Sequence, residues 1–137
     1  SVIEGAVLEG NVTIGPFSHI RKGSLLEQNV RVGNYAEIKN SHIGENSRSG
    51  HYSYIGDAKV GREVNIGAGT ITCNYDGNKK HMTTIGDHAF IGCNTMLVAP
   101  VNIGRNSITG TGSVINKDVP PNSKAIGSPA RIFKNEN

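Results

Sequence analysis

Residues 85–104 read IGDHAFIGCNTMLVAPVNIG, and an aliphatic residue occupies every sixth position of this stretch. These aliphatic residues are Ile85, Ile91, Leu97 and Ile103, and a glycine follows three of them. A six-residue hydrophobic period is typical of a parallel β-helix, in which each unit forms one short strand and one turn. The period is too long for an α-helix, whose apolar residues recur about every 3.6 positions.

The same period extends over most of the chain. Towards the N-terminus, aliphatic residues recur six positions apart at Val2, Leu8, Ile14, Ile20, Leu26, Val32 and Ile38. The period slips by one residue twice, from Ile38 to Ile43 and from Ile55 to Val60. We therefore expect an all-β domain over residues 1–137, with repeats over about residues 2–116.

Three six-residue units close a triangular coil of 18 residues, and successive coils stack about 4.8 Å apart through strand hydrogen bonds. The aliphatic side chains are expected to point into the prism. The glycine that follows many of them is expected to permit a turn with positive φ.

Two segments interrupt the repeat. Residues 73–84, CNYDGNKKHMTT, contain a turn-prone Asp-Gly pair and predict an extruded loop, which in a compact solenoid is usually functional. Residues 117–137 end the repeat with two prolines and predict a C-terminal cap. At the other end the repeat is already in phase at Val2, so we expect a neighbouring chain or a longer polypeptide to cover the first coil.

Composition limits the classes of protein. The net charge of +3 suits small anionic ligands and is too weak to indicate nucleic acid. No apolar run approaches the roughly 20 residues of a membrane span, and we expect no signal peptide. The two cysteines, Cys73 and Cys93, predict free thiols in a cytoplasmic protein.

Arg21 and Lys39 are one coil apart and are expected to lie one above the other. No carboxylate lies within one residue of either, so we expect a bound anion, best a phosphate, to relieve their repulsion. Tyr54 and Asn74 fall near the same column of corners, formed by Ile20, Ile38, Ile55 and Thr72. His51 and Asn65 fall near the adjacent corner. Solvated surface cations and turn-forming asparagines are the simpler alternative.

The chain resembles the C-terminal acetyltransferase domain of bacterial bifunctional N-acetylglucosamine-1-phosphate uridyltransferase/glucosamine-1-phosphate acetyltransferases. The matching segments are IGPFSHIRKG, VGNYAEIKNS, SGHYSYIGDAKVG, VNIGAGTITCNYDG and LVAPVNIG. The resemblance implies a left-handed parallel β-helix, a homotrimer with active sites between subunits, and acetyl transfer from acetyl-CoA to glucosamine 1-phosphate. It places the product in the pathway to UDP-N-acetylglucosamine and cell-wall precursors.

The resemblance also implies roles for individual residues. It makes His51 the general base and requires no metal. It assigns acceptor binding to Arg21, Lys39, Tyr54, Asn65 and Lys80, the last from the extruded loop of a neighbouring subunit. It assigns acetyl-CoA binding to Ala68, Asn74, Tyr75, Cys93, Thr111 and Arg131.

The sequence departs from the family at a few positions. Cys93 replaces a serine, Thr111 replaces an alanine, and the coenzyme arginine aligns with Ser128, with Arg131 nearby. No Gly-rich nucleotide-binding unit precedes the repeats, so we expect no uridyltransferase domain.

Three other functions remain open from the sequence. The first is a hexapeptide acyltransferase with a different amino-sugar acceptor. The second is a zinc hydratase on the same scaffold, which needs three histidines at adjacent corners. The third is an inactive structural β-helix.

Overall fold

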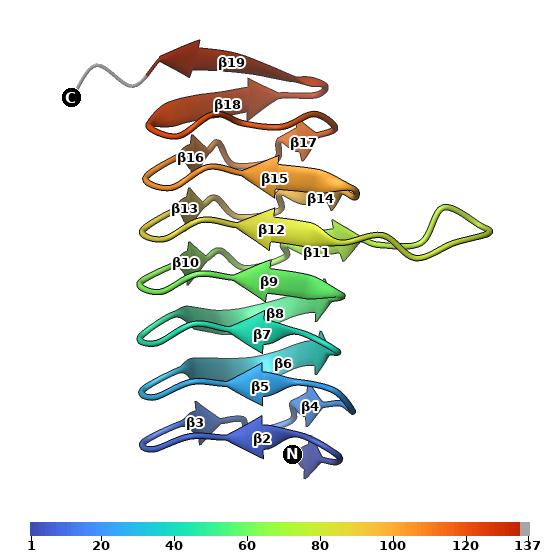
Figure 1. The fold of residues 1–137 in the computed structure, drawn as a ribbon, viewed down its shortest axis with the longest axis vertical. Coiled ribbons are helices and arrows are strands. Elements are labelled where there is room, and N and C mark those ends of the chain that lie inside the picture. Colours follow the sequence, from blue (N-terminus) through green and yellow to red (C-terminus); the bar gives the residue numbers. More distant parts are fainter. Residues whose placement is uncertain (135–137) are drawn as a thin grey trace.

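The computed structural model describes residues 1–134, and the chain in it winds into a triangular prism of about seven coils (Figure 1). The first face contains β1 (Val2–Ile3), β4 (His19–Ile20), the C-terminal parts of β6 (Arg31–Lys39) and β8 (Arg48–Gly56), β11 (Ile71–Cys73), β14 (Met96–Val98) and β17 (Val114–Ile115). The second face contains β2 (Val7–Leu8), β5 (Leu25–Leu26), β7 (His42–Ile43), β9 (Ala58–Val60), β12 (Thr83–Ile85) and β15 (Val101–Ile103).

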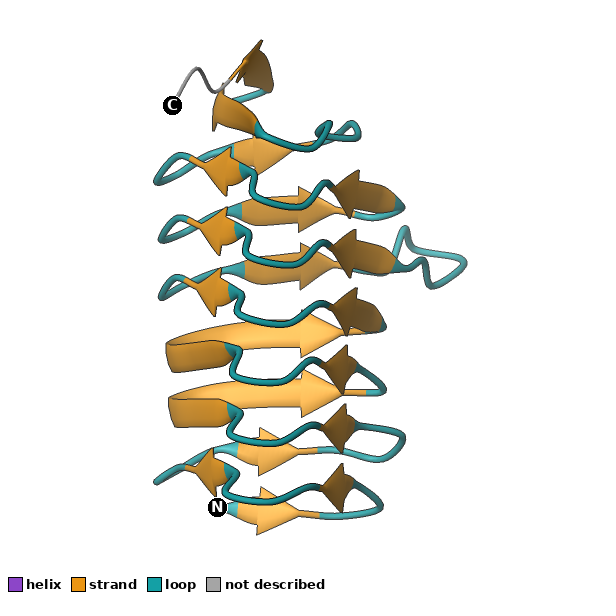
Figure 2. Cartoon of the chain, turned by 60° about the vertical axis from the view of Figure 1, so that its left-hand side comes forward, coloured by secondary structure: helices purple, strands orange, loops and turns teal. Residues whose placement is uncertain are grey.

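The third face contains β3 (Thr13–Ile14), the N-terminal parts of β6 and β8, β10 (Asn65–Ile66), β13 (Phe90–Ile91), β16 (Ile108–Thr109) and β18 (Ser123–Gly127). Because β6 and β8 turn a corner without a break, the first and third faces form one hydrogen-bonded sheet (Figure 2). From the N-terminal end upwards, β5, β7 and β9 run leftwards on the near side and β6 and β8 return behind them, which makes the coil left-handed (Figure 1).

Aliphatic columns fill the prism, as the six-residue period predicts. Ile20 pairs with Ile38, and Ile38 with Ile55, and all three are at most 1% exposed. Thr72 continues this column, and its Oγ1 accepts a hydrogen bond from the Gly56 N–H at 2.8 Å. This column of predicted corners is therefore confirmed, including the one-residue slip between Ile38 and Ile55.

The expected reason for the glycines is wrong at most coils. Gly44 and Gly104 follow core isoleucines, but neither has a positive φ. A Cβ at Gly44 would lie 2.4 Å from the carbonyl oxygen of Gly61, and one at Gly104 would lie 2.3 Å from the Pro121 nitrogen. Close approach of successive coils thus requires glycine there. Most of the non-glycine residues in the left-handed region are asparagines: Asn11, Asn29, Asn40, Asn46, Asn94, Asn106 and Asn122.

The two ends of the prism differ. Val2 and Val7, in the first coil, are 56% and 60% exposed, because no coil of this chain lies beneath them. At the other end, β19 (Ala130–Lys134) pairs antiparallel with β18 and covers the last coil. The repeat continues beyond its expected end at residue 116, because Val119 bridges Ile103 and β18 pairs parallel with β16. Residues 135–137 of the predicted cap lie outside the described residues.

The extruded loop lies between β11 and β12 and projects away from the prism (Figure 1). Tyr75 and Lys80 form an antiparallel bridge in it. At the tip, the Asp76 carboxylate accepts hydrogen bonds from the backbone N–H groups of Asn78 (2.7 Å) and Lys79 (2.6 Å). His81 contacts the other oxygen at 2.7 Å, and these three contacts, with His81 the largest cause, lower the pKa of Asp76 to about 2. The loop is therefore an ordered hairpin.

Candidate functional site

Most of the predicted polar residues lie along two edges of the first face. We call the edge between the first and second faces the Lys39 edge, and it carries Arg21, Lys39, Asn40, Asp57 and Asn74. We call the edge between the third and first faces the His51 edge, and it carries Asn34, His51, Ala68, Cys93 and Thr111. Each edge is built by residues that follow a buried column of aliphatic and hydroxyl side chains, so successive coils place them one above another.

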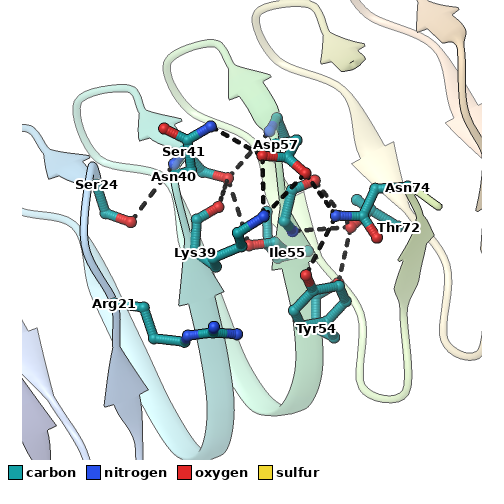
Figure 3. Close-up of polar contacts among 12 residues, drawn as sticks. Arg21, Ser24, Lys39, Asn40, Ser41, Tyr54, Ile55, Asp57, Thr72 and Asn74 are labelled. Carbon is teal, nitrogen blue, oxygen red and sulfur yellow. Dashed lines mark hydrogen bonds and ion pairs between the residues drawn. The ribbon is translucent and has the colours of Figure 1, made fainter. Parts of the chain in front are cut away.

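Asp57 is the centre of the Lys39 edge (Figure 3). It is only 6% exposed, and its two oxygens lie 3.2 and 3.3 Å from Lys39 Nζ. They also accept hydrogen bonds from Asn40 Nδ2 at 2.8 Å and Asn74 Nδ2 at 2.7 Å. Burial alone would raise the pKa of this carboxyl, but the hydrogen bonds from Asn40, Asn74 and Lys39 outweigh it and hold the pKa below its ordinary value.

Lys39 also meets Lys80 of the extruded loop. The contact with Lys80 is the largest cause that raises the pKa of Lys39, and Asp57 adds to it against the effect of burial. The same contact with Lys39 lowers the pKa of Lys80. Lys80 of the same chain therefore lies at this edge, whereas the resemblance implied a lysine from a neighbouring subunit.

Arg21 lies one coil from Lys39, as predicted, but it is not unpaired. Its Nη1 donates to Glu37 Oε2 at 2.6 Å. The expectation that the two cations lack carboxylates is therefore wrong, because Glu37 and Asp57 come from the next coils and not from adjacent positions in the sequence. A cleft lined by Arg21, Lys22, Lys39 and Asn40 still opens beside this pair, and three of its four side chains can carry positive charge.

Asp57 and Glu37 are the site residues that sequence reasoning missed. The signal for Asp57 was present, because it stands 18 residues after Lys39, the same step that connects Arg21 to Lys39. Glu37 could be found from register, since it pairs with His19, two residues before Arg21.

Tyr54 and Asn74 are brought together as predicted. Asn74 Nδ2 donates to Tyr54 Oη at 3.2 Å, and Asn74 is buried while Tyr54 is half-buried. Tyr75 follows Asn74 into the loop and is 59% exposed. The Lys39 edge thus gathers all predicted acceptor residues except Asn65, together with two predicted coenzyme residues.

The His51 edge is joined by backbone hydrogen bonds between coils. Asn34 pairs with His51, and the Gly69 N–H donates to the Tyr52 carbonyl at 2.6 Å. Further up, the Asn94 N–H donates to the Ala68 carbonyl at 2.7 Å, and the Gly112 N–H to the Cys93 carbonyl at 2.8 Å. The edge therefore runs His51, Ala68, Cys93, Thr111, and the side chains of His51, Cys93 and Thr111 are exposed.

Arg131 extends this edge into the cap. It pairs with Ile126, whose side chain lies over Gly110, the residue before Thr111. Asn65 lies beside the same edge on the third face, where its Oδ1 accepts a hydrogen bond from Arg48 Nε at 2.9 Å. The predicted coenzyme residues other than Asn74 and Tyr75 therefore form one line that ends at the cap.

One chain does not bring the two edges together. His51 and Gly56 stand at opposite ends of the first-face part of β8, five residues apart, which corresponds to about 16 Å in an extended strand. Gly56 pairs with Lys39, so the predicted base and the predicted anion site are separated by the width of a face.

Residues 1–134 contain no group of three or more His, Cys, Asp or Glu side chains placed to hold a metal ion. None of these residues forms a helix of the length and hydrophobicity that crossing a membrane would require.

The fold and repeat define the class: the chain is a hexapeptide-repeat parallel β-helix. Residues 82–117 match the family model of the bacterial transferase hexapeptide (six repeats). The chain is also similar to the C-terminal region of the bifunctional protein GlmU, which confirms the resemblance seen in the sequence.

GlmU of Streptococcus equi subsp. zooepidemicus is 53% identical over 134 residues, which are 98% of this chain and 29% of that protein. GlmU of Thermosipho africanus is 56% identical over 132 residues, 96% of this chain and again 29% of that protein. The chain thus spans less than a third of the length of these relatives.

Among solved structures, a variant of GDP-perosamine N-acetyltransferase from Caulobacter crescentus, in complex with CoA and GDP-perosamine, matches with a TM-score of 0.63. The match covers 96% of this chain and 56% of that one at 23% identity. At this identity the match shows the shared fold alone.

Proposed function

We propose that this chain is an acetyl-CoA-dependent N-acetyltransferase that converts glucosamine 1-phosphate to N-acetylglucosamine 1-phosphate. The observation that carries the proposal is the cationic cleft beside Arg21 and Lys39, in a chain more than half identical to part of GlmU. Arginine and lysine side chains at one cleft are the groups that recognise a phosphate monoester.

In the proposed reaction, the neutral amine of the sugar attacks the thioester carbonyl of acetyl-CoA. His51 accepts the proton that the amine loses, the new C–N bond forms, and the C–S bond breaks to release CoA. The backbone N–H of Ala68 stabilises the oxyanion that develops on the carbonyl. Phosphate contacts by Arg21, Lys39 and Lys80, and sugar contacts by Tyr54 and Asn65, supply orientation.

The coenzyme is proposed to lie along the His51 edge. Its thioester would lie near His51 and Ala68, and its remainder would pass Cys93 and Thr111 towards the basic side chain of Arg131. Asn74 and Tyr75 belong to the other edge of the same chain, so in this proposal they would meet coenzyme bound to a neighbouring subunit.

A homotrimer would complete the site by placing the Lys39 edge of one subunit against the His51 edge of the next. The separation of about 16 Å within one chain supports this arrangement. Mixing two variants, each impaired at a different edge, tests it. His51→Ala and Lys39→Ala chains, unfolded and refolded together, should regain activity, because some interfaces then contain both native edges. Recovery no greater than that of either variant alone would oppose sites between subunits.

The test of the function itself is an acceptor assay. The purified protein is mixed with acetyl-CoA and glucosamine 1-phosphate, and the release of the CoA thiol is followed, with glucosamine and glucosamine 6-phosphate as controls. Release that depends on the 1-phosphate would support the proposal. Release with another amine would change the acceptor, and no release with any amine would favour a structural role. The proposal places the enzyme in the cytoplasm, with Cys73 and Cys93 as free thiols.

A further inference from the structure

Asp57 is a buried carboxylate that no step of the proposed reaction uses. It faces solvent with only 6% of its surface, yet it is held by Lys39, Asn40 and Asn74 from two other coils. Placing a charge in such surroundings costs free energy unless the contacts compensate for it. A buried carboxylate held in this way therefore suggests a specific role at the Lys39 edge.

We propose that Asp57 is a positioning residue that fixes the Lys39 ammonium and the Asn74 carboxamide relative to each other. Through them it would align the phosphate of the acceptor with the coenzyme contact made by Asn74. This inference rests on the proposed function, because the roles of Lys39 and Asn74 come from it.

The negative charge of Asp57 argues against a direct role in binding the phosphate. A carboxylate 3.2 Å from Lys39 Nζ repels the phosphate that Lys39 is proposed to bind, and so weakens the affinity of the site for anions. The carboxylate can instead restrict the Lys39 side chain. An ammonium on a flexible four-carbon stem loses conformational freedom when it binds a ligand, and this entropy cost lowers the affinity. Because Asp57 already holds Lys39 in the folded protein, the cost is met during folding and not during binding.

Asn74 is fixed in the same way. Its Nδ2 donates to Asp57 Oδ2 at 2.7 Å and to Tyr54 Oη at 3.2 Å, so the plane of the amide is set by two acceptors. The amide oxygen consequently points away from Asp57 (Figure 3). One carboxylate thus orients a predicted acceptor contact and a predicted coenzyme contact.

The direction in which Asp57→Asn changes the KM for glucosamine 1-phosphate distinguishes a positioning role of Asp57 from an effect of its charge. Asp57→Asn suits the backbone, because Asp57 has a φ of 50° and asparagine tolerates the left-handed region, as at Asn40 (φ 46°) and Asn94 (φ 56°). If Asp57 positions Lys39, the KM for glucosamine 1-phosphate should rise about tenfold although the site becomes more positive, with kcat changed by less than about threefold. An unchanged or lower KM would overturn the proposal.

A double-mutant cycle shows whether Asp57 acts through Lys39. In the Lys39→Ala background, Asp57→Asn should raise the same KM by less than about twofold, because the side chain that it positions is gone. Equal effects in both backgrounds would overturn the proposal. Asp87→Asn is the matched control. This exposed carboxylate accepts a hydrogen bond from the Arg62 N–H at 2.9 Å and lies between β12 and β13, at neither the Lys39 edge nor the His51 edge.

Two additions keep the result interpretable. If Asp57→Asn does not fold, Asn40→Gly keeps a residue that accepts positive φ and removes one donor to Asp57, and it should raise the KM about two- to threefold; no rise would overturn the proposal. If the wild type fails to acetylate glucosamine 1-phosphate, the proposed function fails. Titration with inorganic phosphate then tests Asp57 separately: weaker binding by Asp57→Asn supports positioning, and equal or tighter binding overturns it.

Discussion

The guanidinium of Arg21 is joined to the carboxylate of Glu37 at 2.6 Å, although the two residues are 16 positions apart in the sequence. Both side chains are about 40% exposed, so the pair is a surface contact that solvent weakens. Glu37 thus occupies one N–H donor of Arg21, and a phosphate that binds this guanidinium competes with Glu37 for that donor or uses the others.

Arg21→Ala should raise the KM for glucosamine 1-phosphate about ten- to hundredfold, as expected for the loss of a charge-assisted hydrogen bond. The KM for acetyl-CoA should stay within about twofold. Steady-state kinetics with each substrate varied in turn will measure both. Arg105→Ala removes an exposed arginine from another edge and serves as the control. A rise in the KM for acetyl-CoA alone would contradict the assignment.

Glu37→Gln should have the opposite effect on the acceptor. The amide cannot hold the guanidinium by charge, so Arg21 becomes more available and the KM for glucosamine 1-phosphate should fall or stay unchanged. Initial rates at low acceptor concentration will show the difference. A KM that rises as much as in Arg21→Ala would mean that Glu37 orients Arg21 and does not compete with the phosphate.

His51→Ala should lower kcat by about 10²- to 10⁴-fold, the usual contribution of a general base. Coenzyme affinity, measured by isothermal titration with acetyl-CoA, should change little. His88→Asn is the control, because His88 is an exposed histidine with a φ of 62°, which asparagine also adopts. Wild-type turnover in His51→Ala would remove this residue from the chemistry.

Much of the fold was predictable because the repeat is local. The six-residue period and its two slips predicted the column Ile20, Ile38, Ile55, Thr72, and the structure pairs these residues coil by coil. The role of glycine was not predictable from that period. It depends on how closely Gly44 approaches Gly61 of the next coil, which is a distance between stacked backbones and not a property of either residue.

The residues of the candidate site were predictable where they stand one coil apart in the sequence. One-coil steps placed Arg21 and Lys39 at one edge and His51 at the other. The carboxylates were not predicted because the positions adjacent to Arg21 and Lys39 hold none, whereas the solenoid brings Glu37 and Asp57 in from neighbouring coils. The position of the extruded loop in the chain was predicted, but its direction was not, because nothing in the repeat fixes the path by which Lys80 returns to Lys39.

The two cysteines should differ in reactivity. Cys93 is exposed on the His51 edge, whereas Cys73 is half-buried and burial raises the pKa of its thiol. Because the thiolate is the reactive form, N-ethylmaleimide should label Cys93 first at neutral pH, as mass spectrometry of Cys73→Ser and Cys93→Ser proteins will show. Acetyl-CoA should slow the labelling of Cys93. Faster labelling of Cys73 would contradict this order of reactivity, and no protection of Cys93 by the coenzyme would place the coenzyme away from this edge.

Acid should destabilise the protein through Asp57. The folded-state pKa of Asp57 lies below the ordinary 3.8, so its contribution to the free energy of unfolding is fully present above about pH 4 and is lost as the pH falls through the folded-state pKa. Lys39 behaves in the opposite sense: its pKa is raised, first by Lys80 and then by Asp57, so its contribution is fully present below 10.5 and is lost as the pH rises through the folded-state pKa. The same contact lowers the pKa of Lys80, which offsets part of this contribution. Urea unfolding at pH 7 should show Asp57→Asn to be about 1–3 kcal/mol less stable than wild type, and the two curves should converge below pH 4. A difference that persists unchanged in acid would mean that the charge of Asp57 contributes nothing to folding, and that the carboxylate acts through shape alone.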